Sequence, residues 1–337
     1  MARPQLPTPP PEDGDHQAAD QQQTSPPSPS PSPLDIHLIP APPDLSAYPQ
    51  IGHRPRFARL YRLPDGTVVK TGRLVRPTEA RTLAFVRRRT TVPVPAARGC
   101  WRDPATGHWC LRMDGVAGAL LADVYELLGA GARRRVAAQL RGFVAQMRAL
   151  ETGPGGPDRI AAVDGEPARD VMLQLHQGVY SSETAFRRHI VDGFLDRTLD
   201  ASVDGDEDGC CDDEEDEEDD EDVREVRDIE HRLLGLRPAA AEQGFVFTHG
   251  DLTPRNVVVD EDGRVTGILD WSQAGYYPAY WEYAKACCYP RVMRDRGDGE
   301  LEYVESGFVV DGMPDVILPW RYPTEAAVLK EAYEKAF

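Results

Sequence analysis

The sequence predicts an α+β fold with two lobes, a small lobe built on an antiparallel sheet with one helix and a larger, mainly helical lobe. Two observations support this prediction. Residues 56–118 contain short strand-like runs separated by turn residues, with one helical pattern among them. After Gly118 the hydrophobic pattern changes, and amphipathic helical patterns dominate around one buried strand and one hairpin.

The small lobe is predicted over residues 47–115. The stretch RFARLYRLPDGTVVKTG gives two strands, because its Pro-Asp-Gly segment favours a turn between two β-prone runs. The next stretch, RPTEARTLAFVRRR, gives a helix with Pro77 in the first turn, where proline is tolerated. Extended segments are expected in TTVPVPAARGCW and WCLRMDGVAG, on either side of a DPATGH turn.

The large lobe is predicted over residues 116–337. Its first long helix has an apolar stripe that runs from Val136 to Leu150. Further helices are expected over residues 183–199 and 223–236, and in the stretches YWEYAKACCY and PTEAAVLKEAYEKAF. Between them, FVFTHGD gives a buried strand and NVVVDEDGRVTGILDW gives a hairpin with a four-residue turn.

Two segments lack the composition of a folded core. Residues 1–46 are rich in proline, serine and glutamine, which predicts a disordered tail. Residues 201–223 contain a block of like charges without helix caps, which predicts a disordered acidic insertion in the large lobe. Either segment could contact other proteins.

The net charge of -18 reflects the acidic insertion more than the folded body. Residues 204–222 hold 15 carboxylates and no base, and subtracting them from -18 leaves -3. No basic stripe of the kind that binds nucleic acid is present, so nucleic acid is not an expected partner.

The cysteines and the apolar runs indicate the compartment. The six cysteines include no CxxC pair, which argues against a zinc site. No apolar run is long enough to span a bilayer, and no signal-peptide core is present, so we expect no membrane association and a reducing, cytoplasmic location.

The candidate site lies in FVFTHGDLTPRNVVVDEDGRVTGILDW. Asp251 and Asn256 stand at the entry to one strand of the predicted hairpin, and Asp270 ends its partner strand. Antiparallel pairing therefore brings the three side chains to one end of the hairpin. Oxygen ligands from Asn256 and Asp270 suit Mg²⁺, which leaves Asp251 to accept a proton from a substrate hydroxyl.

These residues resemble a known family. The motif HGDLTPRN, followed by ILDW, is similar to that of the aminoglycoside phosphotransferase and choline kinase-like proteins, which share the protein kinase fold. The segment AGYYPAYWEYAKA resembles the branch of this family that is common in fungal genomes. The resemblance runs from about Gly66 to Lys285, and it is strongest over residues 245–286.

The resemblance implies a role for each matching residue. Asp251 would be the catalytic base, and Asn256 with Asp270 would be the Mg²⁺ ligands. Lys70 would hold the α- and β-phosphates of ATP, and Glu79 on the following helix would pair with it. The backbone of Asp114, Gly115 and Val116 would meet adenine at the hinge between the lobes.

The implied function is transfer of the γ-phosphoryl group of ATP, with Mg²⁺, to a hydroxyl of a small molecule. One alternative is a catalytically silent kinase-like nucleotide-binding or scaffold protein, because HRPRFARLYRLPDG lacks the glycine-rich loop of protein kinases. A protein kinase is a further alternative, but a helix is predicted within about a dozen residues of Asp270, which leaves no space for an activation segment. The sequence leaves open the acceptor, the choice of ATP or GTP and the oligomeric state.

Overall fold

A computed structural model describes residues 44–51, 58–150, 158–170, 178–203, 221–236, 244–288, 291–295, 301–305, 311–318 and 320–336. The chain separates into two units, Met1–Ser32 and Pro33–Phe337, and every described residue belongs to the second. Most of the predicted tail, the central part of the acidic insertion and residues 52–57 lie outside the described residues.

The small lobe is built on a five-stranded antiparallel sheet with the strand order β1-β2-β3-β5-β4. The turn at Pro64-Asp65-Gly66 joins β2 to β3, as predicted, and Gly66 has a φ of +81° that suits glycine. A short 3-10 turn, η1 (Leu45–Ala47), precedes the sheet. The strands are β1 (Gln50–Ile51), β2 (Arg59–Arg62), β3 (Thr67–Gly72), β4 (Ala97–Arg102) and β5 (Trp109–Asp114).

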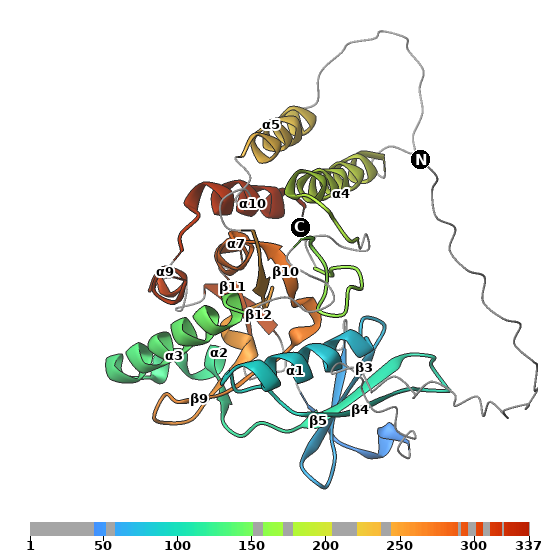
Figure 1. Ribbon diagram of the computed structural model, residues 1–337, viewed down its shortest axis with the longest axis vertical. Helices are drawn as coiled ribbons and strands as arrows, with labels where there is room; N and C mark the ends of the chain where they lie inside the picture. The colour runs from blue at the N-terminus through green and yellow to red at the C-terminus, as the bar shows by residue number, and fades with distance from the viewer. Residues whose placement is uncertain are drawn as a thin grey trace, which may run out of the picture. The chain divides into compact units, whose positions relative to one another are not determined.

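Helix α1 (Pro77–Arg89) covers one face of this sheet and packs against β4 and β5 (Figure 1). Pro77 occupies the first helical turn, which confirms the prediction from its fixed φ and missing N–H. The inward face of α1 buries Ala80, Leu83 and Phe85. It also buries the carboxylate of Glu79, which needs a partner to be stable in that position.

The large lobe combines helices with three small antiparallel sheets. The strand orders of these sheets are β6-β8-β9, β10-β7 and β11-β12. The strands are β6 (Ala119–Leu120), β7 (Phe245–Thr248), β8 (Val257–Val259), β9 (Val265–Ile268), β10 (Gly275–Pro278), β11 (Arg291–Asp295) and β12 (Leu301–Glu305). The helices are α2 (Leu121–Val124), η2 (Tyr125–Leu127), α3 (Ala130–Arg148), α4 (Glu183–Val203), α5 (Glu221–Gly235), η4 (Pro254–Asn256), η5 (Trp271–Gln273), α7 (Trp281–Cys288), α9 (Met313–Ile317) and α10 (Pro323–Ala336).

The predicted patterns and the observed elements agree where the periodicity is strong. The apolar stripe of α3 is buried at Val136, Leu140, Val144 and Met147, and the β8–β9 hairpin forms as predicted. Helices α4 and α5 extend to Val203 and from Glu221, so the predicted insertion 201–223 is helical at both borders.

The sequence patterns did not predict β10, β11 and β12. Strand β10 has only four residues, with glycine and proline at its ends, and both residues weaken a strand signal. It is nevertheless buried throughout, and it pairs with β7 from Gly275–Thr248 to Pro278–Phe245. This pairing places the segment after Asp270 next to the strand that leads to Asp251.

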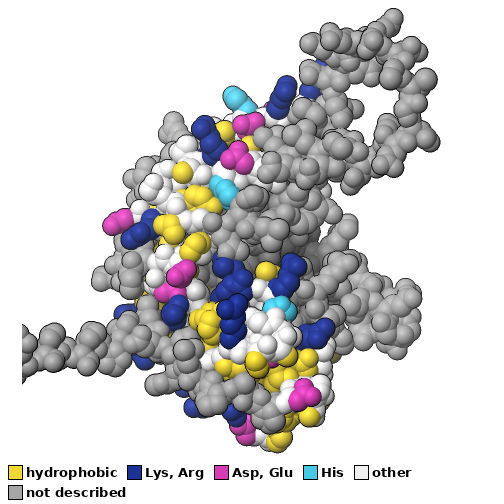
Figure 2. All heavy atoms as spheres, turned by 90° about the vertical axis from the view of Figure 1, so that its right-hand side faces the viewer, with side chains coloured by type: hydrophobic (Ala, Val, Ile, Leu, Met, Phe, Trp, Pro, Cys, Tyr) yellow, Lys and Arg dark blue, Asp and Glu magenta, His cyan; other side chains and the backbone are white. Residues whose placement is uncertain are grey.

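Positive charge is concentrated in the small lobe. Residues 47–115 contain 14 Lys and Arg but 4 Asp and Glu, so the acidity of the chain lies in the remainder. Figure 2 shows Lys and Arg side chains gathered near the centre of one face of the molecule. None of the helices in the described ranges is long and apolar enough to cross a membrane.

Candidate active site between the lobes

Lys70 and Glu79 form a buried ion pair between β3 and α1. The Lys70 Nζ atom lies 2.8 Å and 3.0 Å from the two carboxylate oxygens of Glu79. The two residues are 6% and 2% exposed. A lysine in a strand is usually solvated, so the burial of Lys70 within β3 requires the carboxylate that α1 supplies.

Asp270 joins this pair from the large lobe. Its Oδ1 atom accepts hydrogen bonds from Lys70 Nζ at 2.7 Å and from Ser272 Oγ at 2.6 Å. Among the described non-glycine residues, Asp270 alone has a positive φ, +58°. Such a backbone is strained for a residue with a side chain, and it persists where the surrounding contacts fix it. The carboxylate therefore faces Lys70 while 40% of its side chain stays exposed.

The charges in this cluster are fixed by their neighbours. Burial would lower the pKa of Lys70, but the nearby carboxylates of Asp270 and Glu79 outweigh it and raise the pKa above its ordinary value. Desolvation likewise opposes ionisation of Asp270, and the ammonium group of Lys70 overcomes it and holds the pKa of Asp270 well below the usual range. Burial raises the pKa of Glu79, although Lys70 opposes that shift. One lysine thus faces two carboxylates.

Asp251 and Asn256 form a second group in the loop between β7 and β8. Asn256 Nδ2 donates to both the main-chain oxygen and the Oδ2 atom of Asp251, each at 2.8 Å. Arg255 Nη2 donates to Asp251 Oδ1 at 2.9 Å. Asp251 and Asn256 are 5% and 7% exposed. Because Asn256 directs its nitrogen at Asp251, its amide oxygen is the atom left for another ligand.

The two groups are joined through the strand ends, as the hairpin geometry predicts. The N–H of Leu269, next to Asp270, donates to the main-chain oxygen of Asn256 at 2.7 Å. His249 is fully buried, and its Nε2 atom contacts the main-chain oxygen of Leu269 at 3.0 Å. Its Nδ1 atom accepts the N–H of Asp251 at 3.1 Å, so Nε2 carries the proton. His249 is therefore neutral and bonds the backbone on both sides of the site, and burial lowers its pKa.

The predicted hinge follows β5. The N–H of Asp114 donates to the main-chain oxygen of Ala96 at 3.0 Å, and its carboxylate pairs with Arg98. A nucleotide contact at this position must therefore use the main-chain groups that follow that N–H.

Two close approaches fix the path of the hinge. A Cβ atom at Gly115 would lie 2.4 Å from the main-chain oxygen of Gly66, so only glycine fits there. A Cβ atom at Gly267 in β9 would lie 2.6 Å from a methyl group of Val116, so Val116 packs directly on the β9 backbone. The hinge therefore packs against the β8–β9 hairpin, which leads to Asp270.

Sequence reasoning missed three residues that contact the predicted site. Ser272 and Arg255 bond the carboxylates of Asp270 and Asp251, and no spacing rule singles them out. Glu282 in α7 is 4% exposed, and its Oε2 atom accepts the N–H of His249 at 2.6 Å. A carboxylate between Trp281 and Tyr283 on an apolar helix was the signal that could have identified it.

Glu282 accepts hydrogen bonds from the backbone of the loop that leads to Asp251. Its Oε2 atom also lies 3.4 Å from the backbone nitrogen of Gly250. The Oε1 atom has no hydrogen-bond partner within the described part of the chain. Burial raises the pKa of Glu282 to about 7, and the backbone N–H groups oppose the shift.

The fold and this site define a class of protein. A small antiparallel sheet with one helix carries a buried Lys–Glu pair, and the larger lobe supplies an Asp-x4-Asn loop and a second Asp on a hairpin. This is the bilobal protein kinase-like fold that the sequence predicts. Residues 52–316 match the model of the phosphotransferase enzyme family, so the chain belongs to that family.

The chain is similar to several solved aminoglycoside phosphotransferases. A putative aminoglycoside phosphotransferase from Ralstonia eutropha is 13% identical, with a TM-score of 0.49, over 89% of this chain and 77% of that one. An aminoglycoside 2'-phosphotransferase solved with GDP is 13% identical, with a TM-score of 0.48, over 85% and 81% of the two chains. A thermostable mutant of aminoglycoside phosphotransferase APH(4)-Ia, solved with ADP and hygromycin B, is 14% identical, with a TM-score of 0.45, over 71% and 70%.

One curated relative matches over a short segment. The chain is 58% identical over 26 residues to the uncharacterized protein YcbJ of Bacillus subtilis. The match covers 8% of each protein, so the chain spans a small part of that relative.

Proposed function

We propose that the chain is an ATP- and Mg²⁺-dependent phosphotransferase that moves the γ-phosphoryl group to a hydroxyl of a small molecule. The main support for the proposal is that one hairpin joins the Lys70 cluster to the loop that carries Asp251. Lys70, Glu79 and Asp270 meet at 2.7 to 3.0 Å, and the neighbouring loop holds Asp251 against Asn256 at 2.8 Å.

Nucleotide binding is assigned to Lys70, Glu79 and the hinge. The lysine keeps its positive charge because two carboxylates face it, so it suits the α- and β-phosphates. Glu79 orients Lys70, and backbone groups of Asp114, Gly115 and Val116 are the proposed adenine contact. In this assignment residues 47–115 form the nucleotide-binding lobe, and residues 116–337 form the catalytic and acceptor-binding lobe.

Asn256 and Asp270 fit a divalent cation. Both hydrogen bonds that the described residues make to the Asp270 carboxylate fall on Oδ1. The Oδ2 atom is therefore available as a metal ligand. The amide oxygen of Asn256 receives no hydrogen bond from the described residues, because Nδ2 takes both contacts to Asp251. These are the hard oxygen donors that Mg²⁺ prefers. A bound Mg²⁺ ion would supply charge neutralisation to the phosphates.

Asp251 is the proposed base. It is buried and held on both carboxylate oxygens, by Arg255 on Oδ1 and by Asn256 on Oδ2. A carboxylate fixed in this way is oriented before the acceptor arrives, and it can take the proton of an acceptor hydroxyl as the oxygen attacks phosphorus. The segment after Asp270 reaches α7 at Trp281, which leaves no room for the long activation segment of protein kinases and favours a small acceptor.

The test separates the base from the metal ligand. We expect Asp251→Ala to lower turnover by about 10²–10⁴-fold, the range for loss of a general base, while binding of ATP with Mg²⁺ persists. We expect Asp270→Ala to lose the Mg²⁺-dependent part of nucleotide binding. Turnover would be measured over a panel of hydroxylated metabolites, and binding by thermal shift with ATP, GTP and Mg²⁺.

Glu261→Ala provides the matched control, because Glu261 is an exposed carboxylate in the turn of the same hairpin. It should leave both turnover and binding unchanged. Full turnover in the Asp251→Ala variant would remove Asp251 from the role of base. Absence of turnover in the wild-type protein, together with normal nucleotide binding, would favour a catalytically silent nucleotide-binding protein.

A further inference from the structure

Helix α1 is attached to the large lobe at two places in its first turns. Glu79 meets Lys70, and the backbone N–H of Trp271, which directly follows Asp270, lowers the pKa of Glu79 against the effect of burial. On either side of Glu79, Thr78 Oγ1 and Arg81 Nη1 donate to Asp164 Oδ2 at 3.1 Å and 2.7 Å. The Asp164 side chain is 9% exposed, so this second attachment is largely shielded from water. The proposed phosphotransferase mechanism gives Glu79 a role but gives none to Asp164.

Asp164 stands at the tip of a well-fixed loop, residues 158–170, which we call the strut. The N–H of Gly165 donates to Ala162, and the N–H of Ala162 donates to Glu166, both at 3.0 Å. Gly165 has a φ of +81°, which permits this tight turn. The N–H of Glu166 lies 3.3 Å from Asp164 Oδ1, so the carboxylate is oriented by its own turn.

The N-terminal end of the strut is fixed to the large lobe. Ile160 bridges to Tyr180, and Ala161 bridges to Tyr276 of β10 through an N–H contact of 2.8 Å. A Cβ atom at Gly275 would lie 2.7 Å from the main-chain oxygen of Ala161, so the strut and β10 approach as closely as backbones can.

The C-terminal end of the strut is buried beneath the same strand. Asp170 forms an ion pair with Lys285 and accepts the indole N–H of Trp281 at 3.0 Å. Tyr277 of β10 donates its hydroxyl to the main-chain oxygen of Arg169 at 3.1 Å. Both ends are therefore attached to β10, and the C-terminal end is also attached to α7; both elements follow Asp270 in the chain.

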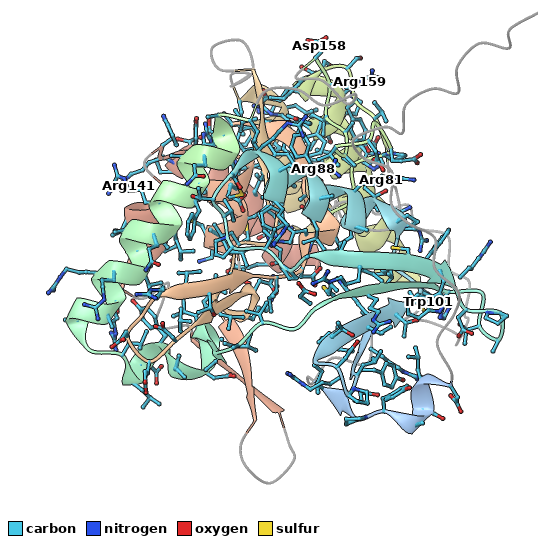
Figure 3. All side chains as sticks on the ribbon, turned by 60° about the horizontal axis from the view of Figure 1, so that its bottom comes forward. Arg81, Arg88, Trp101, Arg141, Asp158 and Arg159 are labelled. Carbon is cyan, nitrogen blue, oxygen red and sulfur yellow. The ribbon has the colours of Figure 1, made fainter. Side chains whose placement is uncertain are left out.

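We propose that Asp164 is a positioning residue that holds the first turn of α1 against the large lobe, so that Glu79 stays in register with Lys70 and Asp270. This inference rests on the proposed function. The strut connects the segment after Asp270 to α1 by a path that does not pass through Lys70. Figure 3 labels Arg81 on α1, and it labels Asp158 and Arg159 at the outer edge of the view, where the strut begins.

The geometry predicts which kinetic constant responds. Without Asp164, Glu79 alone attaches the first turn of α1, and small outward movements of α1 leave Lys70 paired with Asp270 only. The phosphate-binding group is then less often in place, while the loop of Asp251 keeps all its contacts. The KM for the nucleotide should rise, and the KM for the acceptor should not.

The experiment breaks the contact from either side. We expect Asp164→Asn and Arg81→Met each to raise the nucleotide KM by roughly three- to tenfold, the effect of losing one partly shielded ion pair. The double variant should be no worse than the more severe single variant, because both changes remove the same contact. Asp158→Asn, an exposed carboxylate in the same segment, is the matched control and should leave the constants unchanged.

Three kinetic results would overturn the proposal. They are an unchanged nucleotide KM in both single variants, an equal rise in both KM values, and full additivity in the double variant. The charge-reversed pair, Arg81→Asp with Asp164→Arg, should recover part of the nucleotide KM lost in either reversal alone.

A readout without catalysis separates this proposal from the proposed function. Hydrogen exchange of the α1 amides should be faster in Arg81→Met than in the wild type or in Asp158→Asn. If the wild-type protein shows no turnover with any acceptor, the proposed function fails, and hydrogen exchange still tests the strut. Unchanged hydrogen exchange of the α1 amides in Arg81→Met would contradict the proposed role of Asp164, even if the enzyme is active.

Discussion

The described part of the chain contains two buried lysine–carboxylate clusters with the same chemistry and different surroundings. Lys285 pairs with Asp170 inside the large lobe, where their side chains are 2% and 0% exposed. Trp281 Nε1 and Gln273 Oε1 complete that cluster at 3.0 Å and 3.3 Å. Lys70 pairs with Glu79 between the lobes, where the third member, Asp270, keeps 40% of its side chain exposed.

The difference lies in the balance of charge. Around Lys285, the contacts described above join one ammonium group to one carboxylate, with an indole N–H and an amide oxygen beside them. One ammonium group faces two carboxylates around Lys70, and the exposed carboxylate opens to solvent. A buried cluster with surplus negative charge at an opening suits a cation and its ligand, whereas a balanced and closed cluster serves the fold.

The largest expected effect comes from breaking the closed cluster. Lys285→Met removes the ammonium group that pairs with the buried Asp170 carboxylate, so we expect the free energy of unfolding to fall by about 3–5 kcal/mol. Lys70→Met should lower the free energy of unfolding by less, because the partly exposed carboxylate of Asp270 can be solvated by water. Chemical denaturation of both variants measures the difference.

A double variant serves as the control for this comparison. Lys285→Met combined with Asp170→Leu removes both charges of this ion pair together, so part of the lost stability should return. Equal losses in Lys285→Met and Lys70→Met would show that exposure of Asp270 does not distinguish the clusters.

Glu282 extends the comparison to a buried carboxylate that backbone N–H groups hold without a lysine. Burial raises its pKa to about 7 from the ordinary value of 4.5. A raised pKa in the folded state means that its contribution to stability is complete below pH 4.5 and is lost as the pH rises through 7. We expect Glu282→Gln to gain stability relative to the wild type between pH 5 and 8, on the order of 3 kcal/mol.

The measurement is the difference in unfolding free energy between the two proteins at each pH. Taking the difference cancels His249, whose lowered pKa gives the opposite slope, with stability lost as the pH falls below 6.5. A constant difference from pH 5 to 8 would mean that the backbone N–H groups of the loop keep Glu282 ionised throughout.

The two clusters also show what the sequence could predict. Lys70, Glu79, Asp251, Asn256 and Asp270 follow a spacing that the fold imposes, and the structure brings Lys70, Glu79 and Asp270 into one cluster and Asp251 and Asn256 into an adjoining one. Their roles remain a prediction. The hairpin from β8 to β9 follows from alternation and a turn, which are local signals.

The remaining contacts depend on tertiary packing, which a single sequence does not report. Asp170 and Lys285 are 115 positions apart, and neither has a local pattern that marks a partner. Asp164 sits in a turn where aspartate needs no further explanation, so its contact with Arg81 had no signal. Glu282 lies in the predicted helix YWEYAKACCY, but its hydrogen bonds to the loop before Asp251 join positions about 33 residues apart and leave no local signal.

The smallest expected effect comes from an ion pair on the surface, which completes the comparison. Arg98 contacts Asp114 through two hydrogen bonds of 2.5 Å and 2.9 Å, a geometry as good as that of either buried cluster. Its side chain is 57% exposed, however, so water competes for both charges. We expect Arg98→Ala to change the free energy of unfolding by less than about 1 kcal/mol, and the change should shrink further at high salt. A loss that equals that of Lys285→Met would mean that hydrogen-bond geometry, and not exclusion from water, sets the strength of these pairs.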